Sequence, residues 1–152
     1  MAGFTNKGKA LALEIMFNNA GAPTNFYVAL MTSATAPDAD TNTISDLTEI
    51  AAGNGYTTGG ISLTRNSTDF DALAEVDASD WGHIEIKDLV WTASGGAIPG
   101  SGNGARYAVV TDDNVTIGSR EIYAYFDLSS DQSVTDGNTL TLSDFIIRAT
   151  ET

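Results

Sequence analysis

Glu121-Ile122-Tyr123-Ala124-Tyr125-Phe126-Asp127-Leu128 is the stretch that decides the fold class. Apolar side chains alternate along it, as they do in a strand with one buried face. A strand here directs Ile122, Ala124, Phe126 and Leu128 to one face and Tyr123 and Tyr125 to the other. The tyrosine face is therefore a candidate contact surface.

Six further segments show strand composition and are bounded by turn residues, namely residues 25–32, 61–66, 73–76, 83–91, 106–110 and 139–149. The segment 25–32 is apolar on both faces, which is typical of a central strand buried on both sides. No later gap is suited to a crossover helix. The pattern predicts a mainly β protein, a two-sheet antiparallel sandwich. Within the long polar loop 33–60 we expect only a helical turn around Asp46 and Leu47.

One helix is predicted, from Thr5 to about Asn19. Leu13, Met16 and Phe17 recur at spacings of three and four, so they share a face that packs onto a sheet or onto a neighbouring subunit. The chain is divided accordingly into an N-terminal helical arm, residues 1–22, and a β-sandwich domain, residues 23–152. We expect the arm to be an appendage on a complete sandwich.

Charge and composition exclude several classes of partner. The 152-residue chain has seven Lys+Arg and 20 Asp+Glu, a formal charge of −13 that repels the phosphates of nucleic acids. No stretch approaches the roughly 18 apolar residues of a membrane span, so a soluble chain without a membrane partner is expected. The absence of cysteine excludes disulfides, thiolate zinc sites and cysteine nucleophiles.

No catalytic motif stands out in the sequence. His83 is the only histidine, and no Gly-x-Ser-x-Gly pattern accompanies it. The glycine-rich stretch 95–104 lacks the terminal Lys-Ser/Thr of a phosphate loop. We therefore expect no enzyme and no cofactor, with His83 a strand-edge or partly buried hydrogen-bonding residue. A catalytic carboxylate pair stays open, because 20 acidic residues always offer some pair.

One loop has a weak calcium-like pattern. Its oxygen-bearing residues occupy positions 1, 3, 5, 9 and 12 of an EF-hand-like loop: Asp38, Asp40, Asn42, Asp46 and Glu49. Thr43 occupies the position where the sharp turn needs glycine, and the preceding segment is predicted as strand. A solvated acidic loop without metal is the expectation, with calcium as the alternative.

Five features, taken in order, resemble those of a known group of proteins. They are a helical opening with Asn6-Lys7, the strand Phe26-Tyr27-Val28-Ala29-Leu30-Met31-Thr32, the passage Gly55-Tyr56-Thr57-Thr58-Gly59-Gly60, Asp80-Trp81-Gly82 before an apolar strand, and Asp136-Gly137-Asn138-Thr139-Leu140. Together these features resemble small virion proteins of tailed bacteriophages, the group of head decoration (capsid cement) and short tail-fibre-like proteins.

The resemblance implies a jelly-roll-like sandwich that forms a homo-oligomer, with a trimer favoured. This oligomer is expected to be assembled in the host cytoplasm and to lie on the virion surface. The implied partner is the major capsid protein or another virion protein, and the implied function is decoration that stabilises the phage head. The alternatives are a tail-fibre or adhesin module that binds a host receptor, and an enzyme such as a glycan hydrolase. The candidate contact residues are Leu13, Met16 and Phe17, then Tyr56, Trp81, Tyr123 and Tyr125. For Trp81, packing over the sheet edge is the competing interpretation.

Overall fold

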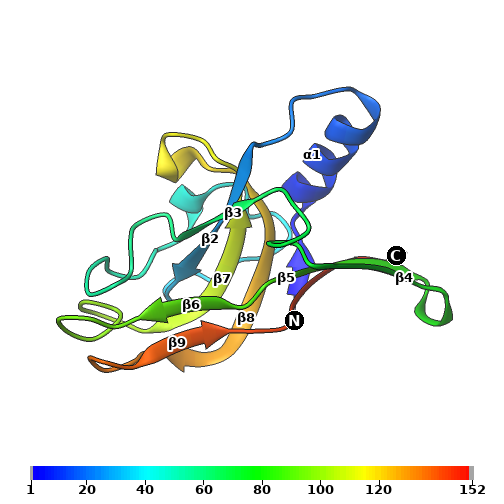
Figure 1. Cartoon of the computed structure of the whole chain (residues 1–152). Coiled ribbons are helices and arrows are strands. Elements are labelled where there is room, and N and C mark those ends of the chain that lie inside the picture. The colour runs from blue at the N-terminus through cyan, green and yellow to red at the C-terminus, as the bar shows by residue number, and fades with distance from the viewer. Residues whose placement is uncertain (1, 151–152) are drawn as a thin grey trace.

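The computed structural model describes residues 2–150 and shows a mainly β protein, as the sequence predicts (Figure 1). Its elements are β1 (Ala2–Phe4), α1 (Asn6–Phe17), β2 (Asn25–Met31), η1 (Ile44–Asp46), β3 (Ile61–Thr64), β4 (Ala72–Val76), η2 (Asp77–Ser79), β5 (Trp81–Ile86), β6 (Leu89–Thr92), β7 (Ala105–Thr111), η3 (Ile117–Ser119), β8 (Ile122–Gln132), β9 (Thr139–Leu142) and β10 (Phe145–Thr150). The predicted helix and the predicted turn at η1 are both confirmed.

The strands form several antiparallel sheets that do not close into a barrel. The largest has five strands in the order β1-β8-β7-β2-β3, and the others are β10-β5-β4 and β6-β9. β2 lies inside the large sheet, between β7 and β3, and Val28 to Met31 are fully buried. The prediction of a central strand buried on both faces is thus confirmed for β2.

A long bent ribbon crosses one face of the large sheet. β5 pairs with β10 and β6 pairs with β9 in one continuous register, with Ile86 opposite Phe145 and Leu89 opposite Leu142. The predicted single strands 83–91 and 139–149 are each broken in two at this bend. Asp144 adopts a left-handed φ of 58° there, which a regular strand does not tolerate.

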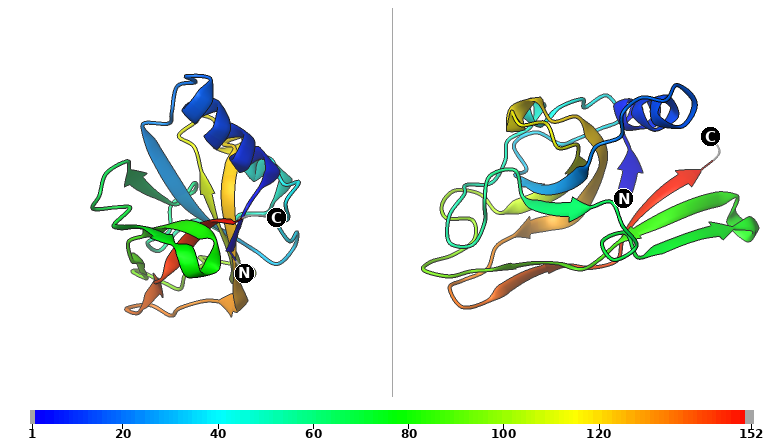
Figure 2. Two further views of the ribbon diagram at one scale, coloured as in Figure 1. Left: turned by 90° about the vertical axis from the view of Figure 1, so that its right-hand side faces the viewer. Right: turned by 45° about the horizontal axis from the view of Figure 1, so that its top comes forward.

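The outer half of the ribbon and β4 extend beyond the body of the protein. Beyond the bend, the ribbon continues as β5 and β10, to which β4 adds a third strand. Figures 1 and 2 show the β4–β5 hairpin projecting from the body on the side where α1 lies. We call β4, β5 and β10 the arm.

The apolar core lies on both faces of the large sheet. The larger cluster fills the space between this sheet and the ribbon, where Phe126 of β8 stacks on Phe145 of β10. The smaller cluster covers the other face and includes Met31, Ile44 and Ile122. The loop 33–60, through η1, therefore acts as a cover for the sheet.

A bulge in β8 changes which of its side chains share a face. Thr111 of β7 lies opposite Ile122 and Val110 lies opposite Ala124, so Tyr123 is an extra residue between them. Ile122 consequently packs in the smaller cluster and Ala124 in the larger one. The predicted alternation is therefore wrong at Ile122, because the bulge rotates the strand there.

The N-terminal segment belongs to the sheet and is not a separate arm. β1, which the sequence did not predict, pairs with β8 at the edge of the large sheet. Thr5 is fully buried, and its backbone N–H donates to the carbonyl of Tyr123 over 3.1 Å. The division at residue 22 thus cuts through hydrogen-bonded structure, and the appendage expected from the sequence is integrated into the fold.

Candidate docking site

An apolar groove separates α1 from the arm. Its volume is about 850 Å³. Its walls come from α1 and β4 and its floor from the large sheet and the ribbon, with the apolar lining residues Phe4, Ala12, Ile15, Met16, Phe26, Phe70, Leu73, Ile84, Val110, Tyr123 and Ile147. Arg65, Asn66 and Ser67 form the polar part of its rim.

Three aromatic rings build the floor of the groove. The Phe26 ring packs edge-on against Tyr123, with centroids 5.2 Å apart, and against Phe70, with centroids 5.7 Å apart. Edge-to-face packing of this kind fixes the rings relative to one another. Burial raises the pKa of Tyr123 to about 12, so its hydroxyl is neutral at physiological pH. The floor is therefore rigid and uncharged.

The start of α1 is fixed to β8 by a close backbone contact. The Thr5 hydroxyl caps the helix by accepting from the Gly8 N–H over 2.8 Å, and it also donates to the carbonyl of Ile122. A Cβ on Gly8 would lie 2.1 Å from the carbonyl oxygen of Tyr123. Only glycine fits at this helix position, and it is the one fully buried residue of α1.

The outward face of α1 is apolar and exposed. Leu13 is 55% exposed, Met16 71% and Phe17 77%. The sequence predicts that these three side chains share a helix face. This face does not pack onto the protein's own sheet, because Gly8 and the half-buried Ala12 and Ile15 face the sheet instead. Leu73, on the opposite wall of the groove, is 81% exposed.

Exposed apolar side chains are concentrated around this groove. Within residues 2–150 six large apolar side chains are exposed, and four of them are Leu13, Met16, Phe17 and Leu73. Single exposed apolar residues are ordinary, but a contiguous group beside an apolar groove is typical of a contact surface. We call the groove and these four side chains the docking surface.

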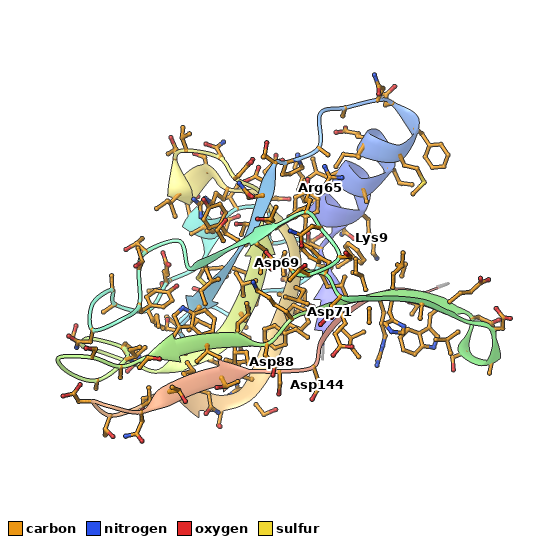
Figure 3. The ribbon with its side chains drawn as sticks, in the orientation of Figure 1. Lys9, Arg65, Asp69, Asp71, Asp88 and Asp144 are labelled. Atoms are coloured by element: carbon orange, nitrogen blue, oxygen red, sulfur yellow. The ribbon has the colours of Figure 1, made fainter. Side chains whose placement is uncertain are left out.

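Basic side chains border the docking surface of this acidic protein. Figure 3 labels Lys9 on α1 and Arg65 just after β3, and neither makes an ion pair with any described residue. Lys7 pairs with Glu121 at 2.8 Å, and the hydrogen bond to Glu121 raises the pKa of Lys7. Asp71, exposed directly before β4, adds a negative charge at the same rim.

Two of the predicted contact tyrosines lie inside the protein. Tyr56 is 2% exposed, and its hydroxyl accepts from the Leu30 N–H and donates to Glu49. Tyr123 is 7% exposed and forms groove floor. The expectation that they lie on an open surface does not hold, since both rings complete the packing around β2. Tyr125 is half-buried beside the smaller cluster, on the other face of the large sheet.

Trp81 lies on the arm, away from the groove. It begins β5 and is half-buried, with the Arg148 guanidinium 4.1 Å from its ring centroid and the His83 ring 5.1 Å away. Trp81 lines a hollow of about 540 Å³, to which three acidic residues, Glu75, Asp77 and Asp80, also contribute. Trp81 therefore packs across the middle strand of the arm's sheet, and its use as an anchor for a neighbouring chain stays a prediction.

The calcium-like loop does not gather its carboxylates. Asp38 and Asp46 each accept hydrogen bonds from nearby backbone N–H groups. The hydrogen bond from the Thr43 N–H is the main cause that lowers the pKa of Asp46. Asp40 accepts from the side chain of Asn6. Glu49 accepts from Tyr56 and Gly59 instead, and Asn42 is exposed. Among residues 2–150, no group of three His, Cys, Asp or Glu side chains could hold a metal ion.

His83 lacks the partners that acid–base catalysis needs. It is half-buried in β5, and its buried Nδ1 has no hydrogen-bond partner among the described residues. A catalytic histidine is oriented by one polar group and acts on another. The partly buried position predicted for His83 is confirmed, whereas the hydrogen bonding expected of it is not found at Nδ1 among the described residues.

No family model matches the chain, and neither a curated protein nor a solved structure matches it. No helix within residues 2–150 has the length and apolar character needed to cross a membrane. The functional proposal for this chain therefore depends on its own residues, above all on those of the docking surface.

Proposed function

We propose that the protein is a structural protein of a tailed-bacteriophage particle, which decorates the head by binding the major capsid protein. The observation that carries the proposal is the docking surface, where Leu13, Met16, Phe17 and Leu73 are exposed around an apolar groove. Apolar surface gathered in this way is stabilised when another protein covers it. The order of sequence features that resembles phage virion proteins supports the same assignment.

A decoration role suits the size of this surface. Burying one large apolar side chain contributes about 1.5–3 kcal/mol, so a few such side chains give a contact of modest strength. On a capsid the same contact recurs in many copies, and simultaneous binding of several subunits raises the effective affinity of each. The protein would then hold neighbouring capsid subunits together by adhesion without chemistry.

The fold fits such a role as a rigid platform. The expected jelly-roll-like sandwich stays part of this proposal, supported by the bent ribbon that lies over the five-stranded sheet with the larger core cluster between them. The aromatic floor and the Gly8 contact hold the docking surface in a fixed shape. A preformed surface loses little conformational entropy on binding.

The alternative is a tail-fibre or adhesin module that binds a host receptor. The specific observation that favours it is the hollow at the projecting arm, where Trp81 lies among acidic residues. An indole ring is suited to stacking on a sugar, and the β4–β5 hairpin of the arm projects from the body (Figure 2).

Copy number on purified particles decides between these proposals. Particles of a phage that encodes this chain are purified on a density gradient, and the protein is quantified against the major capsid protein. Hundreds of copies on DNA-filled heads support decoration. A handful of copies found on isolated tails would support the adhesin, and absence from the particle would refute both.

A matched pair of variants tests the surface. Met16→Asp places a charge in the docking surface, and the particles are expected to lose the protein. Val115→Asp places the same charge at a side chain that is 95% exposed and lies in a separate loop, and binding is expected to persist. Equal binding by both variants would contradict the assignment of this surface.

A further inference from the structure

We infer that the docking surface closes on a second copy of the same chain, giving a two-fold symmetric dimer with Met16 beside the symmetry axis. The inference rests on the proposed use of α1 and the groove for docking, and it names the first partner of that surface. The dimer would then be the form of the free protein, because its interface covers the surface that the capsid protein is proposed to bind, and the two copies would separate on the particle.

Self-complementarity follows from the position of Met16. Met16 lines the groove together with Ala12, one helical turn before it. It also neighbours Leu13 at a spacing of three, so the exposed ridge of Leu13, Met16 and Phe17 continues directly from the groove wall. Ridge and groove are thus one continuous patch.

A continuous patch of this kind favours a two-fold axis. In an isologous dimer the same patch is used by both copies, so the ridge of one copy enters the groove of the other and the reverse contact forms at once. In a ring of three subunits, each chain instead uses one patch for one neighbour and a different patch for the other neighbour. The geometry therefore points to a dimer, in place of the trimer that the family resemblance implies.

The charges at the rim fit a second copy better than a basic partner. The chain has a formal charge of −13, so two copies repel each other over most of their surfaces. Lys9 and Arg65 at the groove are free of ion pairs among the described residues, and they reduce this repulsion where the copies meet. Asp71 adds a negative charge to the same rim. The rim of one copy therefore offers both positive and negative side chains to the rim of the other.

Leu73 supplies the second wall of the interface. It is the most exposed side chain of the four in the docking surface, at 81%, and it faces α1 across the groove. A ridge inserted from a second copy would contact Leu73 on one side and Ala12 on the other. The aromatic floor beneath, formed by Phe26, Phe70 and Tyr123, would be covered as well.

Solution mass of the full chain tests the dimer. Light scattering after gel filtration is expected to give twice the chain mass of 15.9 kDa. Met16→Asp is expected to raise the dimer dissociation constant at least about 100-fold, because the residue occurs twice at the interface. Val115→Asp is the control and should stay dimeric. Circular dichroism of both variants verifies that they fold. A monomeric or trimeric wild type would overturn the inference.

Cross-linking tests the position of the axis. The chain has no cysteine, so Met16→Cys introduces a single thiol. Two such thiols beside a two-fold axis are expected to form a disulfide-linked dimer under mild oxidation, whereas Val115→Cys should remain uncross-linked at the same protein concentration. Equal cross-linking of the two variants would contradict this interface.

The two proposals fail in different ways. A chain that forms the dimer in solution but is absent from particles leaves the inference standing and refutes the proposed function. A monomer that nevertheless binds particles through Met16 refutes the inference and leaves the proposed function standing.

Discussion

Phe126 of β8 and Phe145 of β10 stack face to face, with ring centroids 4.1 Å apart and planes inclined by 8°. Phe126 belongs to the large sheet and Phe145 to the ribbon, and both rings are buried. The pair joins the two layers close to the bend. It belongs to the same core cluster as Ile147, which lines the groove. The docking surface therefore depends on the packing of the core beneath it.

Removing one ring of this pair tests how much its packing contributes to stability. Phe145→Ala is expected to lower the free energy of unfolding by about 3–5 kcal/mol, through lost burial and the cavity left behind. Urea denaturation followed by circular dichroism measures the change. Val115→Ala, at a side chain that is 95% exposed, should change stability by less than about 0.5 kcal/mol. Equal effects of the two would contradict the packing described.

The buried hydroxyl of Tyr56 gives a second prediction. It accepts from the Leu30 N–H over 2.9 Å and donates to Glu49 over 2.6 Å, and burial raises the pKa of Tyr56 far above its ordinary value. Tyr56→Phe leaves the buried N–H of Leu30 unpaired, which costs about 1–3 kcal/mol of stability.

Tyr27→Phe is the control for Tyr56→Phe. The hydroxyl of Tyr27 makes no hydrogen bond with a described residue, while its ring packs under Arg120, 3.7 Å from centroid to guanidinium. Thermal unfolding of the two variants is compared, and only Tyr56→Phe should lower the midpoint. A neutral Tyr56→Phe would mean that Leu30 finds another partner.

Gly8 gives a prediction that runs against helix propensity. Alanine is intrinsically the better helix former, yet Gly8→Ala is expected to destabilise the protein by about 1–3 kcal/mol, because its Cβ would collide with the backbone of Tyr123. Gly21→Ala is the matched control, since no atom lies within 4 Å of its Cβ. Urea midpoints distinguish the two, and a stabilised Gly8→Ala would show that α1 does not lie against β8.

Asp127 gives a prediction on pH. The Arg106 guanidinium, which donates two hydrogen bonds to Asp127, and the Ser129 N–H lower the pKa of Asp127 to about 2. A carboxyl group whose pKa is lower in the folded state stabilises the protein above its unfolded pKa, and this stabilisation is lost as it becomes protonated. We expect the unfolding midpoint to fall between about pH 4 and pH 2.

Asp127→Asn should reduce that fall without abolishing it, because the pKa of Asp69 is also lowered, chiefly by its hydrogen bond from Lys87. Asp77→Asn, at an exposed residue that makes no side-chain hydrogen bond with the described chain, is the control. Urea titrations at a series of pH values give the comparison. An identical pH dependence in Asp127→Asn and the wild type would contradict the assignment.

Local sequence patterns predicted most elements of the fold. β2 is apolar on both faces and lies inside a sheet, as its composition predicts. The helix was predicted as well, but its face with Leu13, Met16 and Phe17 is exposed and does not pack onto the sheet. These features depend on residues close in the chain. The expected position of Trp81 on a sheet also follows from its neighbours.

Other features depend on residues far apart in sequence, and local patterns do not reveal them. The three residues of β1 are too few to show alternation, and they become a strand only because the edge of β8 is available. The bulge at Tyr123 is a mismatch between two strands. The local sequence does not reveal that Tyr56 is buried, because its partners Leu30 and Glu49 come together only through the loop 33–60.

The unbroken register of the ribbon limits how this protein tolerates changes of length. Because Trp81–Ile86 pairs with Phe145–Thr150 and Leu89–Thr92 pairs with Thr139–Leu142 in the same register on both sides of the bend, a single insertion within one of these strands would turn its later side chains to the opposite face. Insertions and deletions within the ribbon are then accepted only as matched pairs, one in each strand. Unmatched changes of length belong in the connections outside it, such as residues 95–104.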